Sequence, residues 1–397
     1  MAENEIISSS DIHFFEGVEK LLEIWFTPPD QKSADLRKIP RSMWDALLKS
    51  VRCEIISFTR NEHIDAYVLS ESSLFVSKRR LILKTCGTTT PLQCLEPLLA
   101  MAEQIGDFSD VEALFYSRKN FKRPDLQVAP HRGFEEEVAL LDSFFEDGRA
   151  YCLGSVNRDC WYMYSWSRGG GEMQRRIENM NVQSIEPDQT IEILMTELDP
   201  QIMSIFTKEE SVSAKDATER SGIHKILPGM VIDDFLFEPC GYSMNGVSKT
   251  NGCYMTIHIT PEPEFSYVSF ESNVASSNYS DLIARVIETF QPGKFVVTIL
   301  ANKTSPSYNA SRNLDYVSSI NDWKRRDIQY CRLESTNSNH ATSHPSGPVS
   351  NKNKANFVVA HLIMMLILLQ LIPFVLVYYI EECSPLVLFS WWRNKIS

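Results

Sequence analysis

The sequence has no excess of positive charge. Lys and Arg number 39 against 51 Asp and Glu, which gives a formal net charge of −12. Binding to nucleic acid requires a basic face that neutralises phosphates, so the composition gives no support for a nucleic-acid partner. An acidic protein is better suited to cationic small molecules.

Paired cysteines are also missing. The chain has nine cysteines, an odd number, and none of them forms a C-x-x-C motif. The sequence therefore predicts neither a zinc site nor a disulfide framework. The N-terminal stretch MAENEIISSS has no apolar core of the kind that a secretory signal carries. Together these absences predict a cytoplasmic, reducing location and no metal.

One long apolar run stands near the C-terminus. Residues 357–380 read FVVAHLIMMLILLQLIPFVLVYYI, which is 24 residues without a formal charge and long enough to span a bilayer. Lys352 and Lys354 precede it, and Glu381 and Glu382 follow it. This charge distribution favours a preceding domain that faces the cytosol. Two interpretations stay open: a tail anchor, or a variant terminus without a role in the rest of the molecule.

The chain divides into four parts by composition. We expect one folded domain over 1–332, a polar disordered linker over 333–355, a candidate transmembrane segment over 356–380 and a short tail over 381–397. Within the first part, strand-rich stretches followed by helices occur in both halves, which suggests an internal duplication. The pattern predicts packed sheets with helices outside them.

Hydrophobic periodicity predicts the individual elements. An apolar stripe after Asp11, a candidate cap, predicts a helix over 13–26. Further helices are expected over 43–49, 92–105, 134–145, 214–221 and 281–290. Strands are expected over 54–58, 66–69, 73–76, 81–85, 151–156, 161–166, 189–197, 235–237, 254–260 and 265–271.

Two short stretches carry groups that could do chemistry. Ser-Glu-Ser-Ser at 70–73 is either an ordinary polar turn or a strained turn in which the Ser72 hydroxyl attacks the Glu71 carbonyl. Such an acyl shift, followed by β-elimination, would leave a pyruvoyl group. In the strand around His258, alternation puts this histidine on one face with Thr256 and Thr260. His258 is therefore either a general base or a hydrogen-bonded structural histidine.

Two further pairs share a strand face. Lys84 and Cys86 lie two residues apart, so the thiol is either a proton donor tuned by a cation or a small buried hydrophobe. Asp188 and Glu192 alternate with Thr190 between them. Two carboxylates on one face repel each other, and either solvent or a bound amine dication could relieve that repulsion.

Six collinear blocks resemble the eukaryotic S-adenosylmethionine decarboxylase family. They extend from His13 to beyond the middle of the chain, with further similarity to about Lys303. The blocks are HFFEGVEKLLEIWF (13–26), AYVLSESSLFVSKRRLILKTCGTT (66–89), FYSRKNF (115–121), PDQTIEILMTELDP (187–200), PCGYSMNG (239–246) and TIHITPEPEFSYVSFE (256–271).

The resemblance implies a fold and an activity. The fold is α+β, a four-layer α/β/β/α sandwich of two largely antiparallel sheets flanked by helices, assembled as a homodimer of processed αβ units. The proenzyme would cut itself at Glu71-Ser72 into a β chain, 1–71, and an α chain that begins at 72. It would then convert S-adenosylmethionine to its decarboxylated form and CO2 for spermidine and spermine synthesis, with a covalent pyruvoyl cofactor and no metal.

The resemblance also implies roles for single residues. Ser72 would become the pyruvoyl group that forms a Schiff base with the substrate, Cys86 would be the proton donor, and Ser243 and His258 would assist processing. Phe15 and Phe237 would stack on the adenine and Glu262 would bind the ribose. Other residues implied around the substrate are Glu16, Glu19, Leu69, Glu71 and Cys240. The activator putrescine would be bound by Glu23, Lys84, Phe115, Ser117, Asp188, Thr190, Glu192 and Glu271.

Two departures from the family pattern leave alternatives open. Leu300 stands where an aromatic residue is expected. The final strand expected after the segment Lys324–Asp327 is missing, because polar sequence and the apolar run follow instead. One alternative is therefore a non-processing, catalytically silent partner that regulates a full-length enzyme. Another is a membrane-tethered protein that binds adenosyl ligands.

Overall fold

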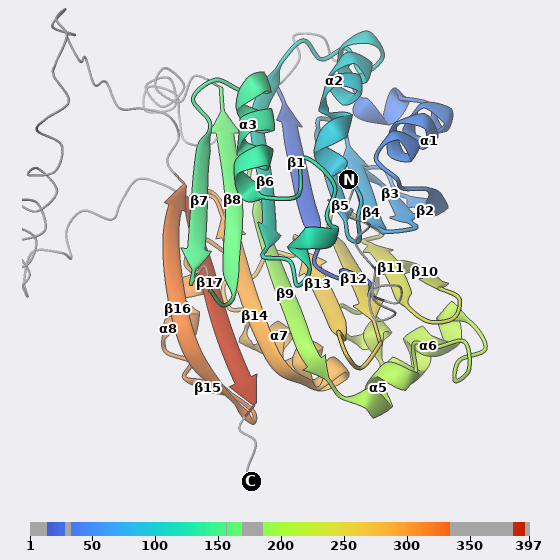
Figure 1. Ribbon diagram of the computed structural model, residues 1–397, viewed down its shortest axis with the longest axis vertical. Coiled ribbons are helices and arrows are strands. Elements are labelled where there is room, and N and C mark those ends of the chain that lie inside the picture. Colours follow the sequence, from blue (N-terminus) through green and yellow to red (C-terminus); the bar gives the residue numbers. More distant parts are fainter. Residues whose placement is uncertain (1–13, 28–32, 156, 169–185, 334–383, 394–397) are drawn as a thin grey trace, which may run out of the picture.

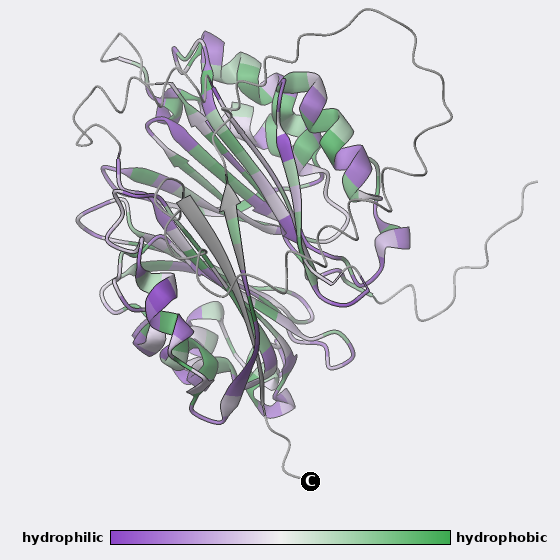
Figure 2. Ribbon diagram, turned by 90° about the vertical axis from the view of Figure 1, so that its left-hand side faces the viewer, coloured by the Kyte–Doolittle hydropathy of each residue, from purple (hydrophilic) through white to green (hydrophobic). Residues whose placement is uncertain are grey.

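Two antiparallel sheets lie face to face, with helices on their outer surfaces (Figures 1 and 2). The computed structural model describes residues 14–27, 33–155, 157–168, 186–333 and 384–393. The side view in Figure 2 shows the four layers in the order helices, sheet, sheet, helices. The α/β/β/α sandwich expected from the sequence is confirmed.

The first sheet comes from the N-terminal half of the chain and has the strand order β2-β3-β4-β5-β1-β6-β8-β7. Its strands are β1 (Lys20–Phe26), β2 (Ile55–Arg60), β3 (Ile64–Leu69), β4 (Ser72–Ser77), β5 (Arg80–Thr85), β6 (Val111–Lys119), β7 (Arg149–Gly154) and β8 (Cys160–Ser167).

The second sheet has the order β10-β11-β12-β13-β9-β14-β17-β16-β15. Its strands are β9 (Gln189–Leu198), β10 (Val231–Leu236), β11 (Tyr242–Val247), β12 (Tyr254–Thr260), β13 (Tyr267–Ser272), β14 (Pro292–Ala301), β15 (Ser319–Ile320), β16 (Trp323–Leu333) and β17 (Ser384–Arg393).

Each sheet carries its own helices and its own apolar core. Helices α1 (Arg41–Ser50), α2 (Leu95–Gln104) and α3 (Phe134–Phe144) cover the first sheet, and one core cluster fills the space beneath them. Helices α5 (Pro200–Ser204), α6 (Ala214–Ser221), α7 (Ser280–Phe290) and α8 (Ala310–Asp315) cover the second sheet in the same way. Because side chains alternate along a strand, the other face of each sheet points into the space between the sheets, where the charged residues described below are buried.

The two sheets repeat one topology. If β1 to β6 are matched in order with β9 to β14, the first strand of each half lies in the middle of its sheet. Thus β1 lies between β5 and β6, and β9 lies between β13 and β14. The repeat extends to the last hairpin, since β6-β8-β7 corresponds to β14-β17-β16. The internal duplication suggested by the sequence is therefore visible as a repeated strand order.

The prediction of a helix over 13–26 is wrong. The structure has an extended segment and then β1, whose residues pair with β5 on one side and β6 on the other. A central strand is buried on both faces, so its apolar residues do not alternate with polar ones and can resemble a helical stripe. Glu19, directly before the strand, and Glu23 within it lie in the space between the sheets, where both are buried, rather than in solvent.

The expectation that the final strand is missing is also wrong. Strand β17 pairs antiparallel with β14 on one side and with β16 on the other. It is formed by the tail that the sequence assigned to a separate part of the chain, so the folded domain includes 384–393 as well as residues up to 333. Its sequence SPLVLFSWWR is rich in residues that favour strands. Strands β6, β11, β14 and β16 were also not expected.

Among the described residues, no helix is both long enough and apolar enough to cross a membrane. The apolar run 357–380 and the linker from 334 lie outside the described residues.

Candidate active site

A two-residue turn joins β3 to β4 at the place where the sequence predicted self-cleavage. Leu69 and Ser72 are partners in the ladder, so Ser70 and Glu71 form the turn. Ser72 has a φ of +116°, in a region that residues with a Cβ rarely adopt because of steric strain. The peptide bond between Glu71 and Ser72 therefore ends on a strained residue.

The two groups that would react in self-cleavage, the Ser72 hydroxyl and the Glu71 carbonyl, each have a specific hydrogen-bond partner. The Ser72 hydroxyl donates to the Glu19 carboxylate, with 2.5 Å between the two oxygens. The Cys86 backbone N–H donates to the Glu71 carbonyl oxygen at 3.1 Å. A donor in this position polarises the carbonyl and can stabilise negative charge that develops on its oxygen.

Glu19 is a buried carboxylate held in its ionised form. Burial alone would raise its pKa, but the charges of Lys84 and His258 and the hydrogen bond from Ser72 bring the pKa below its ordinary value. An ionised carboxylate that already accepts the Ser72 hydroxyl proton can act as its base. The resemblance had implied only a place in the pocket wall for Glu19, and no local sequence signal indicated this contact.

His258 lies on β12, directly opposite Ser243 on β11. Its Nδ1 lies 2.8 Å from the Ser243 hydroxyl, and its Nε2 lies 2.7 Å from Thr256 Oγ1 and 3.0 Å from Ser73 Oγ. Burial lowers the pKa of His258 to about 4, although Glu19 opposes the shift. The imidazole is therefore neutral near pH 7 and has the protonation state that a base requires.

Cys86 follows the end of β5 and is buried. Burial, reinforced by Glu19, raises the pKa of the Cys86 thiol well above its usual range. The group is therefore a protonated thiol, as a proton donor must be. Gly87 beside it has a φ of +62°, and a Cβ there would lie 3.2 Å from the Phe15 ring.

One cavity of about 280 Å³ between the two sheets is lined by Ser72, Cys86, Ser243 and His258. Ser72 and Cys86 come from the first sheet, and Ser243 and His258 come from the second. The other sequence-predicted residues that line the cavity are Phe15, Glu71, Phe237, Cys240 and Glu262. A volume of this order suits a small organic ligand.

Three of the expected substrate residues do not line this cavity, and one of them, Glu19, contacts Ser72 as described above. The Leu69 side chain is fully buried in the core between the first sheet and its helices, so a ligand contact would have to come from its backbone. Glu16 is buried, and its carboxylate accepts the backbone N–H groups of Lys122 and Arg123 at 2.8 and 3.0 Å. Glu16 thus anchors the loop after β6.

The family model for adenosylmethionine decarboxylase matches residues 12–342 of this chain. The chain belongs to the adenosylmethionine decarboxylase family. One relative is the S-adenosylmethionine decarboxylase proenzyme of Drosophila melanogaster. It is 59% identical to this chain over 328 residues, which cover 82% of this chain and 94% of the relative. The proenzyme of Xenopus laevis is 50% identical, over 83% of this chain and 95% of its own length.

A solved structure supports the fold of this adenosylmethionine decarboxylase family member. The monomer of Trypanosoma brucei AdoMetDC-delta26 matches with a TM-score of 0.51 at 20% identity, over 81% of this chain and 99% of its own length. At this identity the similarity concerns the fold alone.

A cluster of buried acidic side chains, here called the acidic cluster, lies beside the active-site cavity and surrounds Lys84. Lys84 is fully buried, and its ammonium group lies 2.8 Å from Glu271, 2.9 Å from Glu192 and 3.3 Å from Glu19. A very small cavity of about 20 Å³ adjoins this cluster. It is lined by residues expected at the putrescine site, Glu23, Phe115, Ser117, Thr190, Glu192 and Glu271, and by Leu300.

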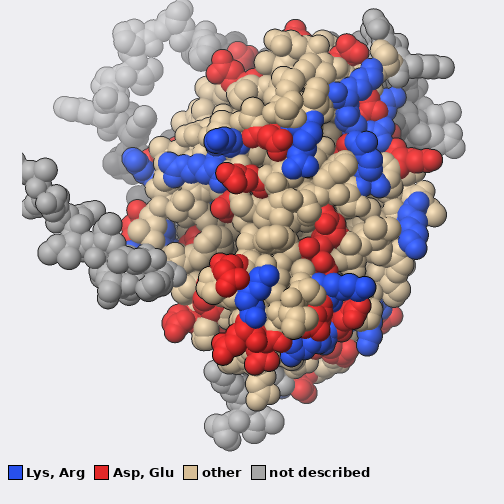
Figure 3. Space-filling model, turned by 90° about the vertical axis from the view of Figure 1, so that its right-hand side faces the viewer, with Lys and Arg blue, Asp and Glu red and all other residues tan. Residues whose placement is uncertain are grey.

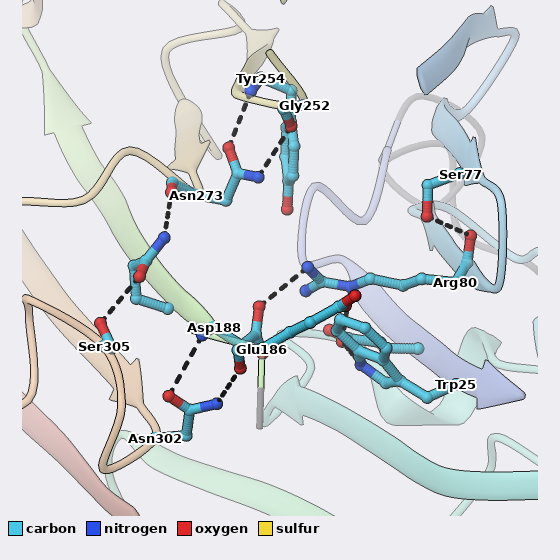
Figure 4. Close-up of polar contacts among 12 residues, drawn as sticks. Trp25, Ser77, Arg80, Glu186, Asp188, Gly252, Tyr254, Asn273, Asn302 and Ser305 are labelled. Atoms are coloured by element: carbon cyan, nitrogen blue, oxygen red, sulfur yellow. Dashed lines mark hydrogen bonds and ion pairs between the residues drawn. The ribbon is translucent and has the colours of Figure 1, made fainter. Parts of the chain in front are cut away.

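Arg80 is a member of the acidic cluster that sequence reasoning missed. Its Nε lies 2.8 Å from Glu23 and its Nη1 lies 2.9 Å from Asp188, while the guanidinium group stacks 4.6 Å from the Trp25 ring centroid. Figure 4 shows the Arg80 side chain extending to Asp188 across Trp25. Alternation along β5 puts Arg80 on the same face as Lys84, and this signal could have identified it.

The carboxylates of this cluster differ in how well they are neutralised. Burial, together with Glu271 and Glu19, raises the pKa of Glu192 to about 7 in spite of Lys84. Burial and Asp188 raise the pKa of Glu23, although Arg80 opposes the shift. Two buried cations thus face five carboxylates, and the cluster can accept further positive charge.

Proposed function

We propose that this protein cuts its own chain between Glu71 and Ser72 and then uses the new pyruvoyl group to decarboxylate S-adenosylmethionine. The observation that carries the proposal is the geometry at Ser72. A strained residue presents its hydroxyl to an ionised carboxylate, and the neighbouring carbonyl is already held by a backbone N–H.

The cleavage steps follow from these contacts. Glu19 takes the hydroxyl proton as Ser72 Oγ attacks the Glu71 carbonyl carbon, and the Cys86 N–H stabilises the oxygen. The C–N bond then breaks, the Ser72 nitrogen takes up a proton, and an ester remains. Neutral His258 removes the Ser72 α-proton, and the ester C–O bond breaks to free the Glu71 carboxylate. The dehydroalanine that is left adds water and loses ammonia, which gives the pyruvoyl group.

The cavity suits the substrate that the family resemblance implies. Phe15 and Phe237 offer aromatic faces for the adenine and for the positive sulfonium, and the Glu262 carboxylate can accept hydrogen bonds from two ribose hydroxyls. When present, the pyruvoyl group supplies a carbonyl that draws the electron pair left by CO2. The Cys86 thiol, which is protonated and lines the same cavity, would protonate the carbon that loses CO2.

The direct test is release of CO2 from carboxyl-labelled S-adenosylmethionine by the purified protein. The unmodified chain should release label, and Ser72→Ala should stay uncut and release none. Label release by an uncut Ser72→Ala chain would overturn the proposal, because the oxygen that starts the chemistry is gone.

We also propose that the acidic cluster binds a diamine activator such as putrescine. Its excess of carboxylate charge supports a dication. A continuous path of contacts leads from Ser72 through Glu19 and Lys84 to Glu192 and Glu271. The adjoining cavity holds about one water and Arg80 already neutralises Glu23 and Asp188, so side chains must move on binding. We therefore expect weak affinity.

The silent-partner and membrane-tethered alternatives depended on a missing final strand. Because β17 fills that place in the sheet, the observation that favoured them is gone. The homodimer of processed units stays a prediction, which sedimentation of the cleaved protein would test.

A further inference from the structure

A second large cavity, which the proposed reaction does not use, opens at the other end of the space between the sheets. Its volume is about 490 Å³. It lies where the end of β6, the turn between β7 and β8, the start of β14 and the middle of β16 come together. The charged residues that line it are Lys119, Arg158, Asp159, Lys294, Arg326 and Asp327.

Four cations and two carboxylates line this cavity, in a protein whose net charge is −12. General composition therefore does not explain its positive sign. On the face shown in Figure 3, by contrast, acidic and basic side chains are interspersed over the surface. The cavity is thus a local concentration of positive charge.

The carboxylates neutralise this charge only in part. Asp159 forms ion pairs with two ammonium groups, with that of Lys119 at 2.5 Å and also with that of Lys294. Asp327 accepts hydrogen bonds from its neighbours on β16, the Ile328 N–H and the Gln329 amide. The two lysine side chains are only 13% and 14% exposed, so solvent does little to stabilise their charge.

The lysine pKa values agree with incomplete neutralisation. Burial, together with the neighbouring Lys119, lowers the pKa of Lys294 to about 8. Burial also lowers the pKa of Lys119, although Glu16 and Cys160 oppose the shift. A bound anion would supply the missing negative charge and favour both ammonium forms.

The cavity also has the shape and the donors of a binding site. Trp161 and Val296 give it apolar walls, and its size exceeds that of a single inorganic ion. Lysine ammonium groups act as point charges for phosphoryl oxygens, and guanidinium groups add planar, two-pronged donors. Carboxylate ligands would suit the arginines as well, but the density of positive charge favours an anion with more than one negative charge.

We propose that this cavity binds a small polyvalent phosphate-bearing anion, held by Lys119, Lys294 and Arg326. The site is distinct from the acidic cluster, although the two are neighbours. Trp161 lines both cavities, and β14 contributes Lys294 and Val296 to one and Thr298 and Leu300 to the other.

Calorimetric titration of the full chain with pyrophosphate tests the proposal, at constant ionic strength and with chloride and orthophosphate as comparison anions. We expect saturable binding of pyrophosphate, weaker binding of orthophosphate and none of chloride. Lys294→Gln and Arg326→Gln should each weaken pyrophosphate binding about tenfold or more, because each removes a charge-assisted contact.

Lys324→Gln is the matched control, since this lysine is exposed on β16 and does not line the cavity. Its affinity for pyrophosphate should equal that of the unmodified chain. Equal weakening in all three variants would mean non-specific attraction to surface charge and would overturn the proposal, as would unchanged affinity in Lys294→Gln and Arg326→Gln. Arg326 is exposed, so its replacement leaves a folded protein for the test even if Lys294→Gln does not fold.

Discussion

Among single residues, self-cleavage depends most on Ser72 and on Glu19, the carboxylate that accepts its proton. Glu19→Gln keeps the shape of that side chain but removes its basicity. We predict that chain cleavage slows about 100-fold, the usual contribution of a positioned base. A time course of fragment formation in denaturing electrophoresis measures it.

Glu23→Gln provides the control for this substitution, because Glu23 is a buried carboxylate only four residues further along the chain but contacts Arg80 rather than Ser72. It should be cleaved at close to the normal rate. If Glu19→Gln is also cleaved normally, the proton goes elsewhere and the role assigned to Glu19 is wrong.

His258 should act at a later step than Glu19. Without the imidazole, the acyl shift can proceed but the Ser72 α-proton stays in place. We therefore predict that His258→Ala accumulates an ester, which hydroxylamine splits between Glu71 and Ser72. Glu19→Gln should show much less hydroxylamine-sensitive material, and normal processing of His258→Ala would contradict the assignment.

Among the secondary-structure elements, the sequence predicted the amphipathic helices well and the strands unevenly: the bounds expected for β9 were within one residue of those observed, whereas β1 was assigned to a helix. Helix α6 has the expected bounds, 214–221, because one face of it is in solvent and the periodicity is clear. Strand β1 was mistaken for a helix because both of its faces are buried. The same reason explains why β14, in which seven of ten residues are buried and do not alternate with exposed ones, was missed.

Removal of strand β17 should destabilise the second sheet. The strand separates β14 from β16 and forms ladders with both, so removal of residues 384–397 leaves each of these two strands with one unpaired edge. We expect the melting temperature to fall by more than about 5 °C, with a tendency to aggregate through the exposed edges. Removal of 394–397 alone, beyond the strand, should change neither, and an unchanged melting temperature in the longer deletion would show that β17 is dispensable.

At the scale of the whole molecule, the candidate site depends on two sheets that the sequence could not place relative to each other. Ser72 and Cys86 were recognisable as candidates from local sequence and family resemblance. Their contact with Glu19, and the position of Ser243 and His258 across the cavity, arise from the packing of one sheet on the other. Local periodicity contains no information about such long-range contacts.

The acidic cluster between the sheets makes the amine response depend on pH. The pKa of Glu192 is raised to about 7, so its carboxyl is largely protonated below that pH and charged above it. A dication favours the charged form. We therefore predict that the putrescine concentration for half-maximal activation falls as pH rises from about 6 to about 8.

Glu192→Gln, which cannot ionise, should weaken the response and flatten its pH dependence. Putrescine activation that is independent of pH in the unmodified chain would mean that Glu192 does not take part in binding the amine.

Self-cleavage at the strained Ser72 should be visible in intact-mass analysis of the purified protein under denaturing conditions. We expect two fragments, one that ends at Glu71 and one that begins with a pyruvoyl group in place of Ser72. Borohydride should add the mass of two hydrogens to the larger fragment alone. A single uncut chain that retains Ser72, in a protein that is folded, would mean that this protein does not process itself.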